Sequence, residues 1–222
     1  DLEAFTEQYA LSQNHSNSLS QKKSSVVRTI PVVVHVIHAN GTENISKAQI
    51  LSQIDALNRD FRRLNSDTSN TPAPFKSIAA DCEIEFCLAV RDPNGNTTTG
   101  ITRTSTASSS FSGYTSMKYA SSGGHDAWNT SKYLNIWVCD LSVNNQDNLL
   151  GYAFPPYGHP SWTSGSWVAD NRQGVVLHYK VVGRNNPRAT GSIAPSNMGR
   201  CAIHEVGHFL GLRHIWADDQ NM

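Results

Sequence analysis

The residues best suited to chemistry lie close together near the end of this sequence. They form the segment His204-Glu205-Val206-Gly207-His208-Phe209-Leu210-Gly211-Leu212-Arg213-His214, with the pattern H-E-x-x-H-x-x-G-x-x-H. Histidines four residues apart on a helix project from the same face, so His204 and His208 can bind one metal ion. Gly211 can adopt a positive φ at no steric cost, which ends the helix and lets His214 reach the same ion. The segment therefore predicts a zinc site with three histidine ligands.

Three histidine ligands leave the fourth position of a tetrahedral zinc ion open, which is typical of catalytic rather than structural sites. Glu205 follows the first ligand and points about 100° around the helix from it, close enough to reach a zinc-bound water. Zinc in such a site lowers the pKa of its water toward about 7 and polarises a carbonyl. We therefore predict peptide-bond hydrolysis with Glu205 as general base. The alternatives are a histidine-bearing amphipathic helix without metal, and a degenerate site that binds zinc without turnover.

Two helices are expected to position the site. Ser196 or Asn197 can cap the helix that carries the motif, which should run to about Leu210. A second helix is expected over residues 46–64, where residues 46–49 form a capping box and Ile45 and Ile50 a hydrophobic staple. Its apolar residues recur at helical spacing and predict one buried stripe: Ile50, Leu51, Ile54, Leu57, Phe61 and Leu64.

Apolar segments elsewhere predict a sheet. Residues 26–38 are apolar on both faces, which is typical of a strand well inside a sheet. Residues 81–90 alternate, with Ile84, Phe86, Leu88 and Val90 on one face, and Gly100 begins a short return strand. Further strands are expected at residues 133–141, 149–154 and 174–182. This order of elements predicts an α/β or α+β fold with a mixed sheet and helices packed against it.

The composition excludes some classes of partner. The chain has 18 basic and 18 acidic residues, so its formal net charge is zero and no basic patch stands out. Nucleic acid and membranes are therefore not expected as partners. No apolar run approaches the roughly 18 residues that a membrane-spanning helix needs. The expected partners are protein or peptide substrates, and the expected state is a monomer or a weak dimer.

The four cysteines leave two alternatives open. Cys82, Cys87, Cys139 and Cys201 do not have zinc-ribbon spacing. Cys82 and Cys87 lie five apart in one expected strand and so point to opposite faces, which argues against a bridge between them. One or two disulfides in an exported protein and buried free thiols are both compatible with the sequence.

The extended zinc motif is that of the metzincin clan of zinc endopeptidases, and its flanks resemble the pappalysin family within that clan. The supporting segments lie in the right order at residues 30–37, 92–95, 100–103, 133–138, 151–155, 174–176, 199–200 and 214–216. Together they cover roughly residues 28 to 219. The zinc motif is specific for the clan, and the flanks extend the resemblance to the family.

The resemblance implies a metzincin-like N-terminal subdomain: a twisted mixed sheet, a backing helix near residues 46–64 and an active-site helix. It also implies an antiparallel edge strand on which substrate binds as an added strand. The candidates for this role are Leu150, Gly151, Tyr152 and Ala153, with Gly151 letting a peptide backbone approach. An ordinary strand with a glycine kink is the alternative for this segment. The implied activity is that of a secreted endopeptidase with one catalytic zinc ion.

The sequence departs from the family after the motif. Family members continue into a C-terminal subdomain with a Met-turn below the zinc, and Met222 follows His214 too closely for that role. We therefore expect residues 28–222 to be a catalytic domain truncated shortly after the zinc motif. Residues 1–27 are expected to be a polar tail or the remnant of a pro-segment, and no secretory signal is visible. A latent or non-catalytic zinc-bearing fragment that binds peptide at a sheet edge is the alternative function.

A second metal is implied by the resemblance alone. Family members bind calcium beyond the third histidine, where this chain has Asp218, Asp219 and Asn221. Their side chains offer the hard oxygen ligands that calcium prefers. A solvated acidic loop is the alternative for these residues.

Overall fold

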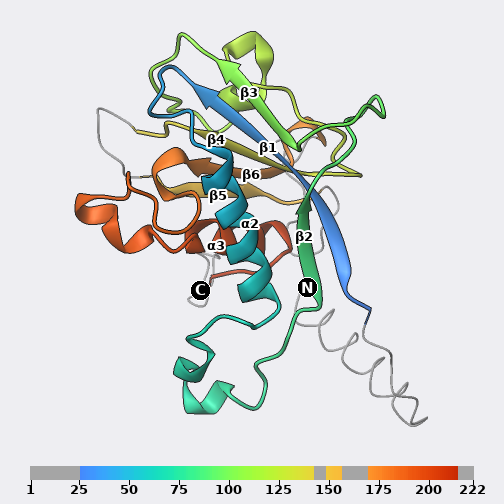
Figure 1. The fold of residues 1–222 in the computed structure, drawn as a ribbon, viewed down its shortest axis with the longest axis vertical. Helices are drawn as coiled ribbons and strands as arrows, with labels where there is room; N and C mark the ends of the chain where they lie inside the picture. Colours follow the sequence, from blue (N-terminus) through green and yellow to red (C-terminus); the bar gives the residue numbers. More distant parts are fainter. Residues whose placement is uncertain (1–25, 143–148, 157–169, 215–222) are drawn as a thin grey trace, which may run out of the picture.

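A twisted six-stranded mixed sheet forms the centre of the fold (Figure 1). The computed structural model describes residues 26–142, 149–156 and 170–214. The strand order is β2-β1-β4-β6-β5, and β3 also pairs with β1. All pairs are parallel except that between β5 and β6. This confirms the expected α/β architecture with an antiparallel strand at one edge.

β1 (Arg28–His38) is the long central strand and pairs with three others. Its first half pairs with β2 (Ile84–Leu88) and its second half with β3 (Ile101–Ser105), in both cases in parallel. β4 (Leu134–Cys139) pairs with the other side of β1. The prediction of a return strand is therefore wrong in direction, because β3 continues along β1 where β2 stops.

The chain between β2 and β3 leaves the sheet and rejoins it at almost the same point. Ala89 N donates to Val32 O on the way out, and Val34 N donates to Gly100 O on the way back. Gly100 has a φ of 69°, and a Cβ there would lie 2.7 Å from the backbone nitrogen of Ala89. Because β2 already ends at Leu88, Val90 lies outside the sheet and is 71% exposed, contrary to the prediction of a strand that extends to residue 90.

The other half of the sheet contains the edge strand. β6 (Gly174–His178) pairs with β4, and every residue of both strands is buried. β6 ends earlier than expected because a 3-10 turn at Tyr179–Val181 follows it. β5 (Gly151–Phe154) is the outermost strand, so one of its edges pairs with no strand among the described residues.

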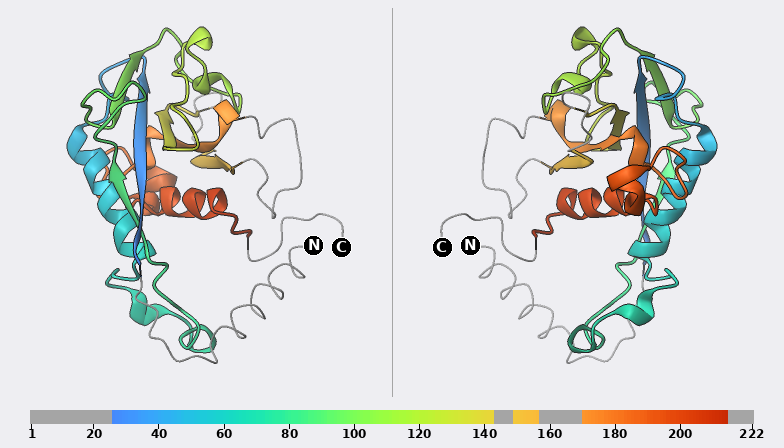
Figure 2. Two further views of the ribbon diagram at one scale, coloured as in Figure 1. Left: turned by 90° about the vertical axis from the view of Figure 1, so that its right-hand side faces the viewer. Right: turned by 90° about the vertical axis from the view of Figure 1, so that its left-hand side faces the viewer.

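The two α-helices of the described residues pack on the same face of the sheet (Figures 1 and 2). α2 (Lys47–Phe61) buries the residues Ile50, Ile54, Leu57 and Phe61 of its predicted stripe. Leu51 and Leu64 are exposed, so the prediction is wrong for these two. Leu51 is about 100° around the helix from its buried neighbour, and Leu64 follows the helix end.

The start of α2 is only partly as predicted. The Oγ atom of Ser46 accepts a hydrogen bond from Gln49 N, so Ser46 is the N-cap. The Gln49 side chain does not complete the capping box. Its Nε2 atom donates to Val182 O and Arg184 O instead, which ties α2 to the chain that follows β6.

α3 (Arg200–Phe209) carries the zinc motif and starts later than predicted. Gly199 precedes it with a φ of 74°, which is not helical, and a separate 3-10 helix occupies Gly191–Ser196. The buried Gln53 side chain of α2 donates to Gly199 O, so the first turn of α3 is held against α2.

The opposite face of the sheet is covered by the irregular segment between β3 and β4. It contains the 3-10 turns η3 (Ser116–Lys118) and η4 (Ala120–Ser122). A second core cluster joins this segment and the sheet: Ile37, Phe111, Met117, Trp137, Cys139, Leu141 and Val176. The sheet is thus enclosed between the two helices and this segment.

None of the four cysteines, all of which lie in described residues, forms a disulfide. Cys139 is buried and Cys201 half-buried, and burial raises the pKa of the Cys201 thiol to about 12. These two residues fit the buried-thiol alternative, whereas Cys82 and Cys87 are exposed. Within the described ranges, no helix has the length and apolar character needed to cross a membrane.

Candidate metal centre

The three histidines come from α3 and from the turn that ends it. At the helix end, Leu212 N donates to Gly207 O and Gly211 N donates to His208 O. This hydrogen-bond pattern is a Schellman motif, which needs a left-handed residue, and Gly211 has a φ of 97°. The chain therefore reverses after the helix and brings His214 back against it, as the sequence predicted.

The Nε2 atoms of the three imidazoles converge on one point. The Nε2 atom of His208 lies 2.9 Å from that of His204 and 3.1 Å from that of His214, and the third separation is 3.2 Å. A tetrahedral zinc ion with Zn–N bonds of about 2.0–2.1 Å holds its ligand nitrogens roughly 3.4 Å apart. In the part of the chain that the structure describes, this is the one group of three metal-ligating side chains found together. Its geometry fits a single zinc ion.

The tautomer of His208 is set by its other ring nitrogen. Nδ1 lies 2.7 Å from the carbonyl oxygen of Leu212, which can only accept a hydrogen bond. The proton therefore resides on Nδ1, and the Nε2 lone pair points toward the other two imidazoles. This is the orientation that a zinc ligand needs.

Glu205 is buried between α3 and the edge strand. It is 8% exposed, and an ideal Cβ on Gly151 would lie 3.1 Å from its Cγ atom. Burial raises the pKa of Glu205 to about 7, with the charge of His214 acting in the opposite direction. The carboxyl group is thus next to both the histidine cluster and β5, which Figure 2 shows lying above α3.

The open edge of β5 presents the main chain of alternate residues. His178 N donates to Leu150 O, so Leu150 directs its main chain toward β6. In an antiparallel pair every second residue faces the same neighbour, so Tyr152 also faces β6. Gly151 and Ala153 therefore direct their N–H and C=O groups to the open edge. The structure divides the four predicted substrate-binding residues into two that face this edge and two that do not.

The side chain of Tyr152 lies on the face of β5 away from α3. Its hydroxyl donates to Tyr114 O at 2.8 Å and lies 3.0 Å from Met117 Sδ. These contacts, and the neighbouring Lys118, were not predicted from the sequence. Residues 104–131 have no periodic pattern, so nothing in them indicated a segment packed behind the edge strand.

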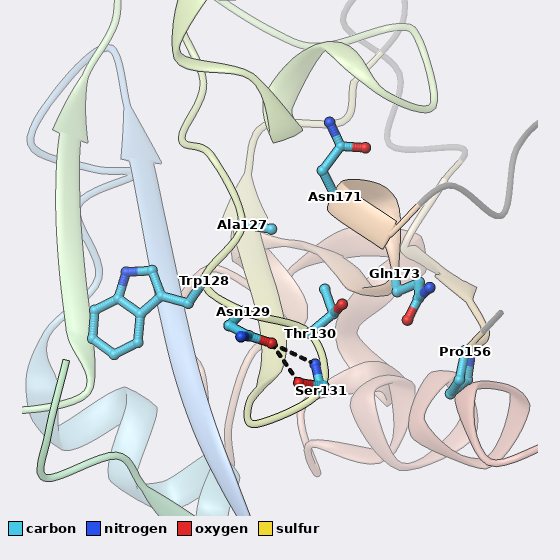
Figure 3. A pocket seen from close by; sticks show the side chains of 8 residues that line it. All are labelled: Ala127, Trp128, Asn129, Thr130, Ser131, Pro156, Asn171 and Gln173. Carbon is cyan, nitrogen blue, oxygen red and sulfur yellow. Dashed lines mark hydrogen bonds between the residues drawn. The ribbon is translucent and has the colours of Figure 1, made fainter. Parts of the chain in front are cut away.

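A hollow of about 320 Å³ adjoins the histidine cluster, and Leu212 and Arg213 line it together with the three imidazoles. A larger hollow, of about 620 Å³, lies beyond the end of β5 (Figure 3). Its polar lining is neutral, with the side-chain amides of Asn129, Asn171 and Gln173. The described residues that line the larger hollow include no acid, base or metal ligand, so among the described residues only the smaller hollow has groups suited to chemistry.

The predicted calcium ligands Asp218, Asp219 and Asn221 lie outside the described residues. The same holds for residues 1–25 of the predicted N-terminal tail.

Comparison with known proteins relates the whole described fold to metalloproteases. No protein-family profile matches the chain. The chain is 26% identical over 207 residues to an extracellular metalloprotease of Arthroderma benhamiae, a match that covers 91% of this chain and 59% of that protein. The chain thus spans about three fifths of the length of this curated relative.

Two solved structures are more similar. The mature mirolysin of Tannerella forsythia, in complex with a cleaved peptide, is 51% identical with a TM-score of 0.76, covering 88% of this chain and 67% of that chain. A promirolysin mutant from the same organism is 48% identical with a TM-score of 0.77, covering 98% of this chain and 66% of that chain.

Proposed function

This chain belongs to the pappalysin family of metzincin metalloproteases, and from this we propose that the protein is a zinc-dependent endopeptidase. The observation that carries the proposal is the convergence of three imidazole Nε2 atoms within 3.2 Å of one another, on a helix that also carries Glu205. We assign the zinc ligands to His204, His208 and His214.

Glu205 is the proposed general base. A zinc ion held by the three histidines would polarise the scissile carbonyl and make a water molecule more acidic. The Glu205 carboxylate takes a proton from the attacking water, whose oxygen bonds to the carbonyl carbon. The same carboxyl then gives that proton to the leaving amine as the C–N bond breaks. Burial raises the pKa of the Glu205 carboxyl, whereas a zinc ion beside it would lower that pKa.

We propose that the substrate lies along β5 as an added strand. Gly151 and Ala153 supply the main-chain hydrogen bonds, because their N–H and C=O groups face the open edge. Leu150 and Tyr152 support the strand from within the sheet. A peptide extended past Phe154 would reach the neutral hollow near Pro156, which offers amide groups to a polar side chain. The complex of mature mirolysin with a cleaved peptide supports this proposal by relationship.

The remaining proposals concern the protein as a whole. Secretion is supported by the relatives that are named extracellular metalloproteases. A pro-segment at residues 1–27 is supported by the match to promirolysin, which covers about a tenth more of this chain than the match to the mature enzyme. A monomeric or weakly dimeric state is proposed from the sequence alone, and a calcium site at Asp218, Asp219 and Asn221 from the family resemblance.

Replacement of Glu205 tests the proposed activity. We expect Glu205→Gln to lower kcat by about 10²- to 10⁴-fold on a denatured protein substrate, because it removes the proton acceptor. Bound zinc, measured by elemental analysis, should stay at one ion per chain. A chelator should abolish cleavage by the unsubstituted protein, and added zinc should restore it.

Glu85→Gln is the matched control, because Glu85 lies in β2 at the opposite edge of the sheet from β5. It should leave kcat unchanged. Stoichiometric zinc with no cleavage of any substrate would contradict the proposal and favour the latent, peptide-binding alternative. Absence of zinc from the purified protein would contradict both.

A further inference from the structure

Lys118 is a fully buried amine in the segment behind the edge strand. It ends η3, its exposed fraction is 0%, and its Nζ atom donates to the carbonyl oxygen of Arg172 at 2.5 Å. No carboxylate pairs with it among the described residues. A buried amine is costly unless its environment compensates for lost hydration, so the surroundings of Lys118 require an explanation.

Three aromatic rings surround the amine. Its Nζ atom lies 3.9 Å from the ring centroid of Phe154, 4.8 Å from that of Trp137 and 5.6 Å from that of Tyr152. Distances below about 6 Å allow a cation to be attracted by the face of a ring. Two of the three rings, including the nearest, belong to β5, so the amine contacts the edge strand as well as Trp137 of β4.

β5 is therefore held from both faces. On one face, Gly151 lies against Glu205 of α3. On the other face, the Tyr152 hydroxyl donates to Tyr114 O, and the Nζ atom of Lys118 lies against the ring of Phe154. β5 has only four residues and one sheet neighbour, so pairing with β6 alone holds it weakly. The contacts of Lys118 supply a second attachment.

We propose that Lys118 is a positioning residue for peptide binding, which holds β5 at the height and inclination that let Gly151 and Ala153 pair with an extended substrate. The proposal rests on the proposed function, because it assigns the support of the same edge strand. Lys118 touches neither the histidine cluster nor the substrate. It acts through the rings of Tyr152 and Phe154 and through the carbonyl of Arg172.

The protonation of Lys118 is consistent with this role. Burial lowers the pKa of Lys118 to about 6, and the charge of Arg172 lowers it further, while the surrounding rings favour the charged form. Both forms of the amine can donate to the Arg172 carbonyl. The hydrogen bond to Arg172 therefore does not depend on a single charge state, whereas the attraction of the rings is strongest for the charged amine.

Lys118→Met tests the proposal, because methionine fills a similar volume without the amine. In the zinc-loaded protein, we expect amide hydrogen exchange at Tyr152 and Phe154 to become about tenfold faster, since these amides are protected by pairing with β6. The melting temperature should change by less than about 3 °C, because the lost contacts are offset by removal of a buried amine. For a peptide long enough to lie along β5, KM should rise about tenfold and kcat should change less than about twofold.

Lys76→Met is the matched control, since Lys76 is exposed in a loop, and it should change none of these quantities. Unchanged exchange at Tyr152 and Phe154 in Lys118→Met would overturn the proposal, whatever the activity of the protein. Faster exchange in every strand, with a large drop in melting temperature, would also overturn it by showing a purely structural role. If Lys118→Met does not fold, Phe154→Leu is the second variant, because it removes the nearest ring and leaves the amine. Faster amide exchange at Tyr152 in that variant would support the proposal, and unchanged exchange would overturn it.

The exchange readout separates this proposal from the proposed function. Local loosening of β5 in a protein that cleaves no peptide would support the role of Lys118 and contradict the protease assignment. Normal cleavage with a KM unchanged by Lys118→Met would support the protease assignment and contradict the role of Lys118.

Discussion

At the scale of single residues, the site depends on one contact that the motif does not contain. Gly151 lies so close to its neighbours that a Cβ would be 2.9 Å from Val176 O of β6 and 3.1 Å from Glu205 Cγ of α3. The sequence predicted a glycine that lets a peptide approach. The structure adds a second reason, because the glycine also makes room for the carboxylate that is the proposed general base.

Gly151→Ala should therefore impair catalysis without removing any functional group. We expect the added methyl group to displace Glu205 or β5, at a cost of about 1–3 kcal/mol in the free energy of unfolding. A displacement of the base should also lower kcat by about tenfold or more. Steady-state kinetics and urea unfolding measure the two effects.

Gly41→Ala provides the control, because no atom lies within 4 Å of a Cβ at that position. Its stability should be unchanged or slightly higher. A Gly151→Ala variant with normal kcat would show that the contact between β5 and Glu205 is not needed for the reaction.

The convergence of the three histidines could be predicted because helix geometry relates them locally. The spacing of His204 and His208 and the positive φ of Gly211 follow from 3.6 residues per turn and from glycine's freedom. The direction of the Tyr152 main chain, toward β6 and not toward the open edge, could not be predicted, because it depends on the register between β5 and β6. Lys118 could not be predicted either, because its neighbours come from three separate parts of the chain.

At the scale of elements, a buried histidine of β1 links this strand to β3 and β4. The Nε2 atom of His35 donates to Asn135 Oδ1 of β4 at 2.9 Å, and its Nδ1 accepts from the Thr102 hydroxyl of β3 at 2.8 Å. The ring stacks on His125 with centroids 4.3 Å apart. The fully buried His35 therefore has a packing role inside the sheet.

His35 should make the stability of the fold depend on pH. Burial lowers the pKa of His35 to about 3, an effect that His125 adds to and the hydrogen bond to Asn135 opposes. Below about pH 6.5 the unfolded chain therefore takes up a proton that the folded protein does not. Titration of His35 leaves the free energy of unfolding unchanged above that pH. Below it, the free energy of unfolding falls by about 1.4 kcal/mol for each pH unit of acidification, down to about pH 3.

Urea unfolding of the protein and of His35→Gln at about pH 7.5 and about pH 4.5 measures this contribution. We expect acidification to destabilise His35→Gln less than the unsubstituted protein, by about 2–3 kcal/mol. His38→Gln, at the half-buried end of the same strand, serves as control. An equal loss in all three proteins would show that His35 does not cause the pH dependence.

Most elements could be predicted from local patterns, but their mutual directions could not. Both helices and all six strands lie where the sequence indicated, with shifted ends. The parallel course of β3 could not be predicted, because a turn signal does not show that the chain rejoins β1 rather than β2. The exposed Leu51 and Val90 show that an apolar residue at the margin of a stripe or strand need not be buried.

At the scale of the whole molecule, the histidine site holds the last described residues against the helix that packs on the sheet. α3 packs on β5, β6 and α2, and the turn after α3 brings back His214. Three imidazole nitrogens that face one another at 2.9–3.2 Å gain most when a cation occupies their centre. Metal binding should therefore stabilise the fold as well as the site.

Removal of zinc should lower the melting temperature. At free zinc near 1,000 times its dissociation constant, the stabilisation is about 4 kcal/mol, which corresponds to roughly 10 °C for a chain of this size. Differential scanning calorimetry with and without a chelator measures the shift. His204→Ala should abolish it, and His125→Ala should leave it intact. A melting temperature unaffected by zinc in the unsubstituted protein would contradict a metal held by these three residues.

The loop between β2 and β3, residues 89–100, is a suitable place to attach a probe to the protein. Both of its ends are fixed on β1 only two residues apart, and Asp92 organises the turn between them by accepting from Asn94 N and Asn96 N. Lengthening a loop whose ends are already fixed costs little entropy. A fluorophore or an affinity tether inserted near Asn94 would therefore lie at the sheet edge opposite β5. There it can label or immobilise the protein while the proposed peptide-binding edge stays accessible.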